Sequence, residues 1–177
     1  MVVGARDEVL VGAARAGDVD AFEVLVRRYE LPMYRGALRM LGSRADAEDA
    51  TQDAFVLAWQ KLAGFRGESA FSTWLYRILT NRCLNVQGSN RRAEPLGERM
   101  LDAGGGGPVE VLERREQWHA VSEAVLGLPG EQRVALVLRE FEGLPYAEIA
   151  QVLGITVAAV KGRVHRARRG VVEAVGR

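Results

Sequence analysis

The stretch from Tyr146 to Arg169 constrains the fold most, because its spacing favours two short helices joined by a tight turn. Gly154 stands where the first helix ends and the backbone needs a positive φ. Thr156 can then cap the second helix. Ala150 is small enough for the helices to cross closely, and Val160 can fill the gap between them. The apolar positions at helical spacing are Ile149, Ala150 and Leu153, then Val160, Val164 and Ala167.

The second of these helices is strongly basic. A basic helix in a helix-turn-helix suits the phosphate-lined groove of duplex DNA. Charge alone is explained equally well by a solvated face of an ordinary helical hairpin. The small residue, the glycine and the central valine at their offsets favour DNA binding. The basic residues are Lys161, Arg163, His165, Arg166, Arg168 and Arg169.

The composition excludes several other classes. The chain has 177 residues, of which 48% are hydrophobic and 27% charged, which indicates one globular domain or two small ones. Cys83 is the only cysteine, so no intrachain disulfide or cysteine-cluster zinc site is possible, and we expect no metal or cofactor. We expect Cys83 to be a small buried hydrophobe more readily than a redox switch. No membrane-spanning run or signal peptide is apparent, which predicts a cytoplasmic protein without membrane insertion.

Residues 7–42 read as two helices. In the first, Val9, Leu10 and Ala13 share the predicted inner face. Pro32 is expected to break or kink the second, because proline lacks the amide hydrogen and clashes with the preceding turn.

A third helix is predicted from Ser43 to Leu62, with Ser43 as its cap. One side of this helix is mostly polar, so two interpretations stay open. Periodicity alone favours an ordinary core helix with an acidic start over a docking surface for a basic partner. The residues of this side are Asp49, Gln52, Asp53 and Val56.

Residues 64–92 combine aromatic, arginine and asparagine side chains. The loop 64–69 carries one aromatic residue of exposed type, Phe65, and a helix capped by Ser72 or Thr73 is predicted to run to about Gln87. Flat rings, amides and cations are what unstacked bases need. The alternative is that the aromatic residues of this helix belong to the core, which is expected for Phe71 and evenly balanced for Trp74.

The glycine run DAGGGGP divides the chain. We therefore predict an all-α protein with two small helical domains, 1–92 and 118–177, joined by a flexible linker at 93–117. The apolar residues Val111, Trp118, Val121, Val125 and Leu128 outline the first helix of this second helical unit. After a break at Pro129-Gly130, another helix follows over Val134–Phe141, and the helix-turn-helix completes the domain.

Several strings in this order resemble the sigma subunits of bacterial RNA polymerase, especially the small extracytoplasmic-function class of the sigma-70 family. These strings are DAEDATQDAFVLAW (46–59), FRGESAFSTWLYRILTNRCLN (65–85), LPGEQRVALVLREFEGLPYAEIAQVLGI (128–155) and AVKGRVHRARR (159–169). Two positions depart from the family pattern. Ala159 stands where threonine is frequent and Gly162 where serine is frequent, which removes two possible phosphate contacts.

The resemblance implies a function for each surface. Asp49, Gln52, Asp53 and Val56 match the surface for the clamp helices of the polymerase largest subunit, and the family also contacts the polymerase flap. The part that captures non-template bases of the −10 element is matched by Phe65, Trp74, Asn81, Arg82, Asn85, Arg91 and Arg92. The part that reads the −35 duplex is matched by Thr156, Lys161, Arg163, His165, Arg166 and Arg169. The resemblance further implies promoter DNA and an anti-sigma factor as partners.

Two other functions are alternatives to a sigma subunit. A conventional helix-turn-helix regulator would bind duplex DNA without polymerase, but residues 1–92 show no ligand-pocket signature. An enzyme is disfavoured because the sequence has no phosphate-binding glycine loop, metal cluster or nucleophile-base pair.

Overall fold

The computed structural model describes residues 6–90 and 108–176, and this part of the chain contains helices and no strand. The first unit, residues 6–90, consists of α1 (Asp7–Arg15), α2 (Val19–Leu41), α3 (Arg44–Lys61), the 3₁₀ turn η1 (Leu62–Gly64) and α4 (Phe71–Asn90). The second unit, residues 108–176, consists of α5 (Pro108–Gly127), α6 (Gly130–Leu136), the π-helical turn η2 (Val137–Phe141), α7 (Tyr146–Leu153) and α8 (Val157–Val175). The predicted all-α fold class is confirmed.

Local capping signals fix where several helices begin and end. The side chains of Asp18, Ser43 and Thr156 each accept a hydrogen bond from the backbone N–H three residues further on, at 3.1, 3.3 and 3.2 Å. Each such bond satisfies an amide that has no partner inside its helix. Gly42 and Gly154 follow α2 and α7 with φ of 73° and 65°, a left-handed conformation that favours glycine. The predicted roles of Ser43, Thr156 and Gly154 are confirmed.

The buried face of α1 differs from the predicted one. Leu10, Val11 and Ala14 are buried against α2, whereas Val9 is 60% exposed and Ala13 is only partly buried. Val9 and Val11 both flank Leu10, so helical spacing allows either valine to share the buried face with Leu10. The packing of α1 on α2 selects the stripe that contains Val11.

Pro32 does not break α2, which continues through it as one helix. Buried side chains at Met33, Ala37 and Met40 follow the proline and hold the helix against the core. Of the two predicted effects, a break or a kink, the break is wrong, because tertiary packing can outweigh the backbone hydrogen bond that a proline removes. The kink stays a prediction.

Two further helix boundaries differ from the sequence prediction. α4 runs past Gly88 to Asn90, and α5 begins at Pro108, inside the segment 93–117 assigned to a linker. Proline suits the first helical position, because its missing N–H would have no partner there. The glycine run at 104–107 lies outside the described residues.

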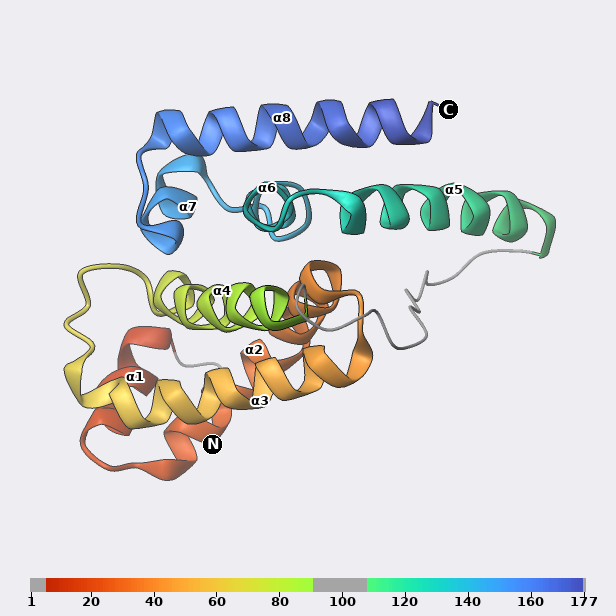
Figure 1. Cartoon of the computed structure of the whole chain (residues 1–177). Helices are drawn as coiled ribbons and strands as arrows, with labels where there is room; N and C mark the ends of the chain where they lie inside the picture. The colour runs from red at the N-terminus through yellow and green to blue at the C-terminus, as the bar shows by residue number, and fades with distance from the viewer. Residues whose placement is uncertain (1–5, 91–107, 177) are drawn as a thin grey trace.

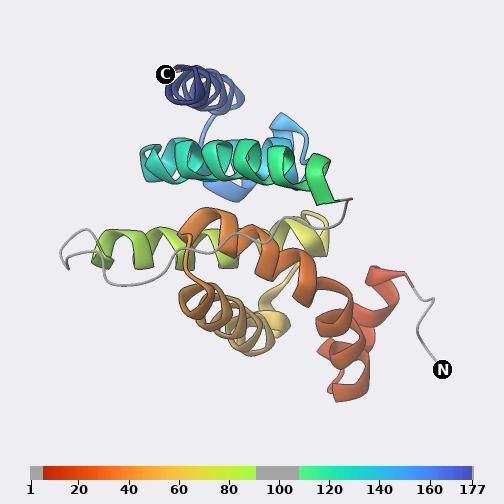
Figure 2. The same ribbon diagram turned by 90° about the vertical axis from the view of Figure 1, so that its right-hand side faces the viewer.

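The helices form two stacked units, with α4 facing α7 across the boundary (Figures 1 and 2). In the first unit α4 packs on α2 and α3, and in the second α8 packs on α5, α6 and α7. Buried side chains from both units form one continuous hydrophobic cluster. The polar surfaces of interest lie on α3, α4 and α8, around this shared core.

Candidate nucleic-acid interface

The helix-turn-helix has the packing predicted from its sequence. The Gly154 and Ile155 amides both donate to the carbonyl of Ala150, which closes the turn. Val160 is fully buried between the helices, and Ala150 is 9% exposed. The second helix of the motif, α8, is thereby fixed with its apolar stripe inward and its basic residues outward.

Most of the candidate −35 residues on α8 lie on the outside. Arg163 differs, because its Nη2 lies 2.7 Å from Oε2 of Glu131 and its side chain is only 21% exposed. This ion pair links α8 to α6, so Arg163 has a structural partner in the absence of DNA. Arg169 pairs with Glu173 along the same helix, 3.2 Å apart. The exposed candidates are Thr156, Lys161, His165, Arg166 and Arg169.

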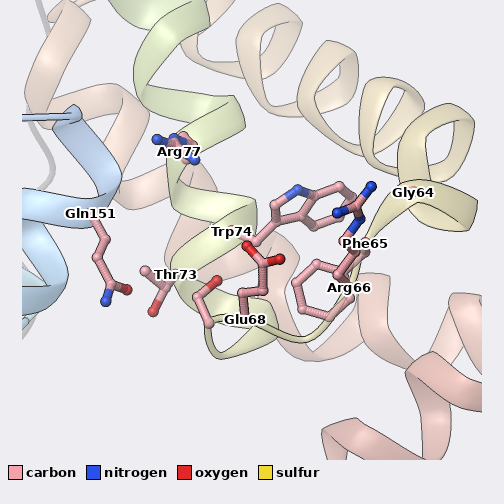
Figure 3. Close-up of a pocket in the computed structure, with 9 residues that line it drawn as sticks. Gly64, Phe65, Arg66, Glu68, Thr73, Trp74, Arg77 and Gln151 are labelled. Atoms are coloured by element: carbon pink, nitrogen blue, oxygen red, sulfur yellow. The ribbon is translucent and has the colours of Figure 1, made fainter.

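A cleft of about 430 Å³ lies between the loop after η1 and the start of α4 (Figure 3). Phe65 and Trp74 line it, with ring centroids 5.0 Å apart, and Phe71 packs 6.0 Å from Phe65. Phe65 was expected to be an exposed aromatic, but it is 8% exposed, because its ring completes this aromatic cluster. Trp74 is half-buried, whereas Phe71 and Tyr76 belong to the core.

Arg66 and Arg77 also line the cleft, and both are exposed. Neither arginine is among the residues predicted from the sequence to bind −10 DNA. Arg77 follows Trp74 by three residues and precedes Asn81 by four on α4, a spacing that places all three along one side of a helix. This spacing is the sequence signal from which Arg77 could have been predicted to lie beside Trp74 and Asn81. For Arg66, the fold of the loop decides its position.

Further along α4, Asn81 and Asn85 are exposed and one helical turn apart. Arg82, the remaining candidate on this helix, is half-buried, and its Nη2 lies 2.7 Å from Oδ2 of Asp53 on α3. A residue assigned to −10 DNA and one assigned to polymerase docking are thus paired with each other. Arg91 and Arg92 lie outside the described residues.

The polar side of α3 is available for contact. Asp49 and Gln52 are exposed, and Val56 is 50% exposed. Trp59, 39% exposed, packs against Phe22 with ring centroids 4.9 Å apart, so it adds an apolar edge to this side. The surface therefore combines exposed polar groups with a fixed apolar border.

The structure does not build a chemical centre at these surfaces. Among the side chains that the structure describes, in 6–89 and 118–176, no group of three or more histidine, cysteine or acidic residues could hold a metal ion. Cys83 is fully buried, and burial raises the pKa of its thiol to about 12, which fits a small hydrophobe and not a reactive thiol. Across the same residues, no helix is long and apolar enough to cross a membrane.

Comparison with known proteins finds two matching protein families and several similar proteins. The family Sigma-70 region 2 matches residues 25–93, and Sigma-70 region 4 matches residues 118–169. The chain is 33% identical to the RNA polymerase sigma-H factor of Pseudomonas aeruginosa over 99% of this chain and 96% of that protein. It is 35% identical to the ECF RNA polymerase sigma-E factor of Escherichia coli over 93% of this chain and 92% of that protein.

A solved structure is similar over both units. CnrH, in complex with the cytosolic domain of CnrY, superposes with a TM-score of 0.75 and 28% identity over 96% of this chain and 97% of that one. Such coverage includes the stacking of the two units as well as the fold of each. The chain therefore belongs to the sigma-70 family, within the extracytoplasmic-function class of RNA polymerase sigma factors, whose members direct transcription initiation.

Proposed function

We propose that this sigma subunit docks on core RNA polymerase through α3 and recognises a promoter with two separate surfaces, the cleft with α4 and the outer face of α8. The observation that carries the proposal is the succession of regions 2 and 4 in one chain, which sigma factors match along nearly its whole length. The proposed functional division is 1–92 for docking and −10 recognition and 118–177 for −35 recognition.

Docking on α3 is supported by its exposed groups. Asp49 can accept charge-assisted hydrogen bonds from cationic side chains of a partner, and Gln52 can add directional neutral bonds. Val56, 50% exposed, adds apolar contact area on the same helix. Asp53 would contribute either through its carboxylate or by holding Arg82 in position at 2.7 Å.

Capture of opened −10 bases is supported by the cleft and α4. An unstacked base needs a flat partner, hydrogen-bonding groups for its edge and cations for its phosphates. Phe65 and Trp74 offer ring surface at the cleft, Asn81 offers an exposed amide, and Arg77 offers charge. The asparagines lie further along the same helix, so a single strand could follow α4 away from the cleft.

Reading of the −35 duplex is supported by α8. The helix presents Lys161 and Arg166 outward, and arginine can grip a guanine edge bidentately in the major groove. Nζ of Lys161 lies 5.9 Å from the centre of the Tyr146 ring, a cation–π contact that orients the ammonium without neutralising its charge. Arg163 would have to leave Glu131 before it could contact DNA.

Two more partners belong to the proposal. A groove between α5 and α8, lined by Leu128, Pro129 and Ala174 among others, offers apolar surface for the polymerase flap. CnrH is solved with the cytosolic domain of another protein, and we extend this to an anti-sigma factor for the present chain. We propose no catalytic role for the present chain, and we place this chain in the cytoplasm with RNA polymerase.

Run-off transcription with core polymerase, followed by mapping of start sites, tests the proposal. Genomic promoter fragments would be transcribed by core polymerase with and without the purified chain. Start sites that depend on the chain and share upstream sequence would support a sigma subunit. Duplex binding without polymerase and without new start sites would instead support a conventional regulator.

A further inference from the structure

Arg163 stands at the edge of the outer face of α8. It follows Val160 by three residues and precedes Ala167 by four, and both of these residues are fully buried. Residues three and four apart share one side of a helix, so Arg163 lies beside the apolar stripe and not in the middle of the outer face. Only 21% of its side chain is exposed, whereas His165 and Arg166 are exposed. The surroundings of Arg163 therefore differ from those of the other cations proposed to bind the −35 duplex.

A carboxylate from another helix is paired with this arginine. Glu131 lies in the first turn of α6, which packs against α8 (Figure 1). Its Oε2 is 2.7 Å from Nη2 of Arg163, and 67% of the Glu131 side chain is exposed. Within the described part of the chain, neither Lys161 nor Arg166 has such a carboxylate partner. The helix proposed to enter the DNA groove thus carries both paired and unpaired cations.

The pair contributes little to holding the two helices together. Both helices supply fully or almost fully buried apolar side chains to the core, such as Val134 from α6 and Val164 from α8. An ion pair with one partner largely in water adds little stability. The main consequence of Glu131 therefore concerns the charge of Arg163 and not the packing of α6 on α8.

The position of the pair relates it to the DNA backbone. When a helix lies in the major groove, its outermost side chains meet base edges and the side chains on its flanks face the phosphates. Arg163 lies on such a flank, and the exposed carboxylate of Glu131 lies beside it. A phosphate that approached Arg163 would have to displace the carboxylate and would also be repelled by it. One anion would only replace another, so the duplex gains little from this arginine.

We propose that Glu131 is a positioning residue for −35 recognition, which holds Arg163 against α6 and so keeps one cation away from the phosphates of the duplex. The inference rests on the proposed binding of α8 to the −35 element. Phosphate contacts attract every sequence alike, whereas base contacts discriminate between sequences. Glu131 therefore lowers the sequence-independent part of binding and leaves recognition to the exposed side chains of α8.

Two variants and a matched control isolate this effect. Glu131→Gln keeps the shape of the side chain, removes its charge and releases Arg163. Glu131→Gln with Arg163→Ala also removes the released cation. The control is Glu140→Gln, because it too removes one negative charge from the second unit and releases an arginine of α8, Arg168. Arg168 stands five residues, or roughly 7.5 Å, further from the N-terminal part of α8, the part of a recognition helix that reads bases.

The assay is titration of holoenzyme, formed from core polymerase and each full-length chain, with promoter duplexes at several salt concentrations. One duplex carries a −35 element identified by start-site mapping, and the other carries the same element scrambled. We expect Glu131→Gln to bind both duplexes severalfold more tightly at low salt, with an unchanged ratio between them. One added phosphate contact should make the fall in affinity between roughly 50 and 200 mM salt about 3.5-fold larger than in wild type. The double variant and Glu140→Gln should keep the wild-type salt dependence.

Three results would overturn the inference. The first is an unchanged affinity and salt dependence in Glu131→Gln. The second is weaker binding of Glu131→Gln with a smaller ratio between intact and scrambled elements, which would show that Glu131 orients Arg163 toward a base edge. The third is an equal gain from Glu140→Gln, which would reduce the effect to net charge.

Lys161→Ala separates a failure of this inference from a failure of the proposed function. If Lys161→Ala weakens promoter binding while Glu131→Gln changes nothing, only the role of Glu131 is wrong. If neither variant affects binding, the assignment of α8 to the −35 duplex fails as well. Melting curves of the free chains verify folding, and Glu131→Gln should melt close to wild type because its ion pair is largely exposed on the Glu131 side.

Discussion

Reversing the charge on the outer side of α3 should abolish docking without unfolding the chain. In Asp49→Lys with Gln52→Lys, the first change reverses one charge and the second adds one. Both side chains are exposed, and neither has a hydrogen bond or ion pair to another described residue. The loss of stability should therefore stay between a few tenths and about 1 kcal/mol.

The effect on polymerase binding should be far larger. Like charges that face each other across an interface cost several kcal/mol, and about 3 kcal/mol already corresponds to more than a hundredfold in the dissociation constant. The assay is titration of core polymerase with labelled chain, together with a melting curve of the free chain. Asp53 is left unchanged, because its pairing with Arg82 would confuse docking with the position of α4.

Glu30→Lys provides the control, because Glu30 is an exposed acid on α2 that is not among the residues proposed for docking. It should lower affinity only slightly, through general charge. A folded double variant that binds core as tightly as wild type would remove α3 from the docking mechanism. An equal loss in the control would show that net charge alone is responsible.

Three other outcomes are expected. If Lys161 contacts phosphate, Lys161→Ala should weaken binding to all promoters alike and lower the salt dependence of binding by about one charge. If Arg166 reads a base, Arg166→Ala should cost about 1–3 kcal/mol of binding free energy and relax specificity. Holoenzyme titrations on matched promoters at several salt concentrations separate the two effects. Phe65→Ala with Asn81→Ala should impair strand opening more than initial duplex binding, and equal permanganate reactivity in variant and wild type would contradict the assignment. Burial raises the pKa of Glu142, despite its hydrogen bond from Tyr76 and its charged neighbours. The stability that this residue contributes to the folded chain is therefore fully present below the usual carboxyl pKa and is lost as pH rises through the raised value, so mild acidification should raise the melting temperature, and Glu142→Gln should remove that part of the pH dependence.

The sequence by itself determined the local structure of the helix-turn-helix. Gly154 is needed because the turn requires a left-handed backbone, and Thr156 caps α8 because a free amide three residues on needs an acceptor. Val160 is buried because only one side of α8 is apolar. Each signal acts within a few residues, so it can be read without knowledge of the rest of the fold.

Tertiary structure decided everything that depends on a distant neighbour. Packing on α2 selected Val11 instead of Val9, and an aromatic cluster buried Phe65. Arg163 looked like a free cation on a basic helix until α6 brought Glu131 to 2.7 Å. Spacing along one helix cannot show which side chain of another element will approach it.

The stacking of the two units is the furthest of these effects from the sequence. Glu142 follows a π-helical turn and precedes Gly143, a position that looks like ordinary loop polarity. Its burial depends on Tyr76, 66 residues away, and on Arg39, 103 residues away. A buried ion pair forms only where the fold supplies both partners and excludes water, so this pairing could be recognised only in three dimensions.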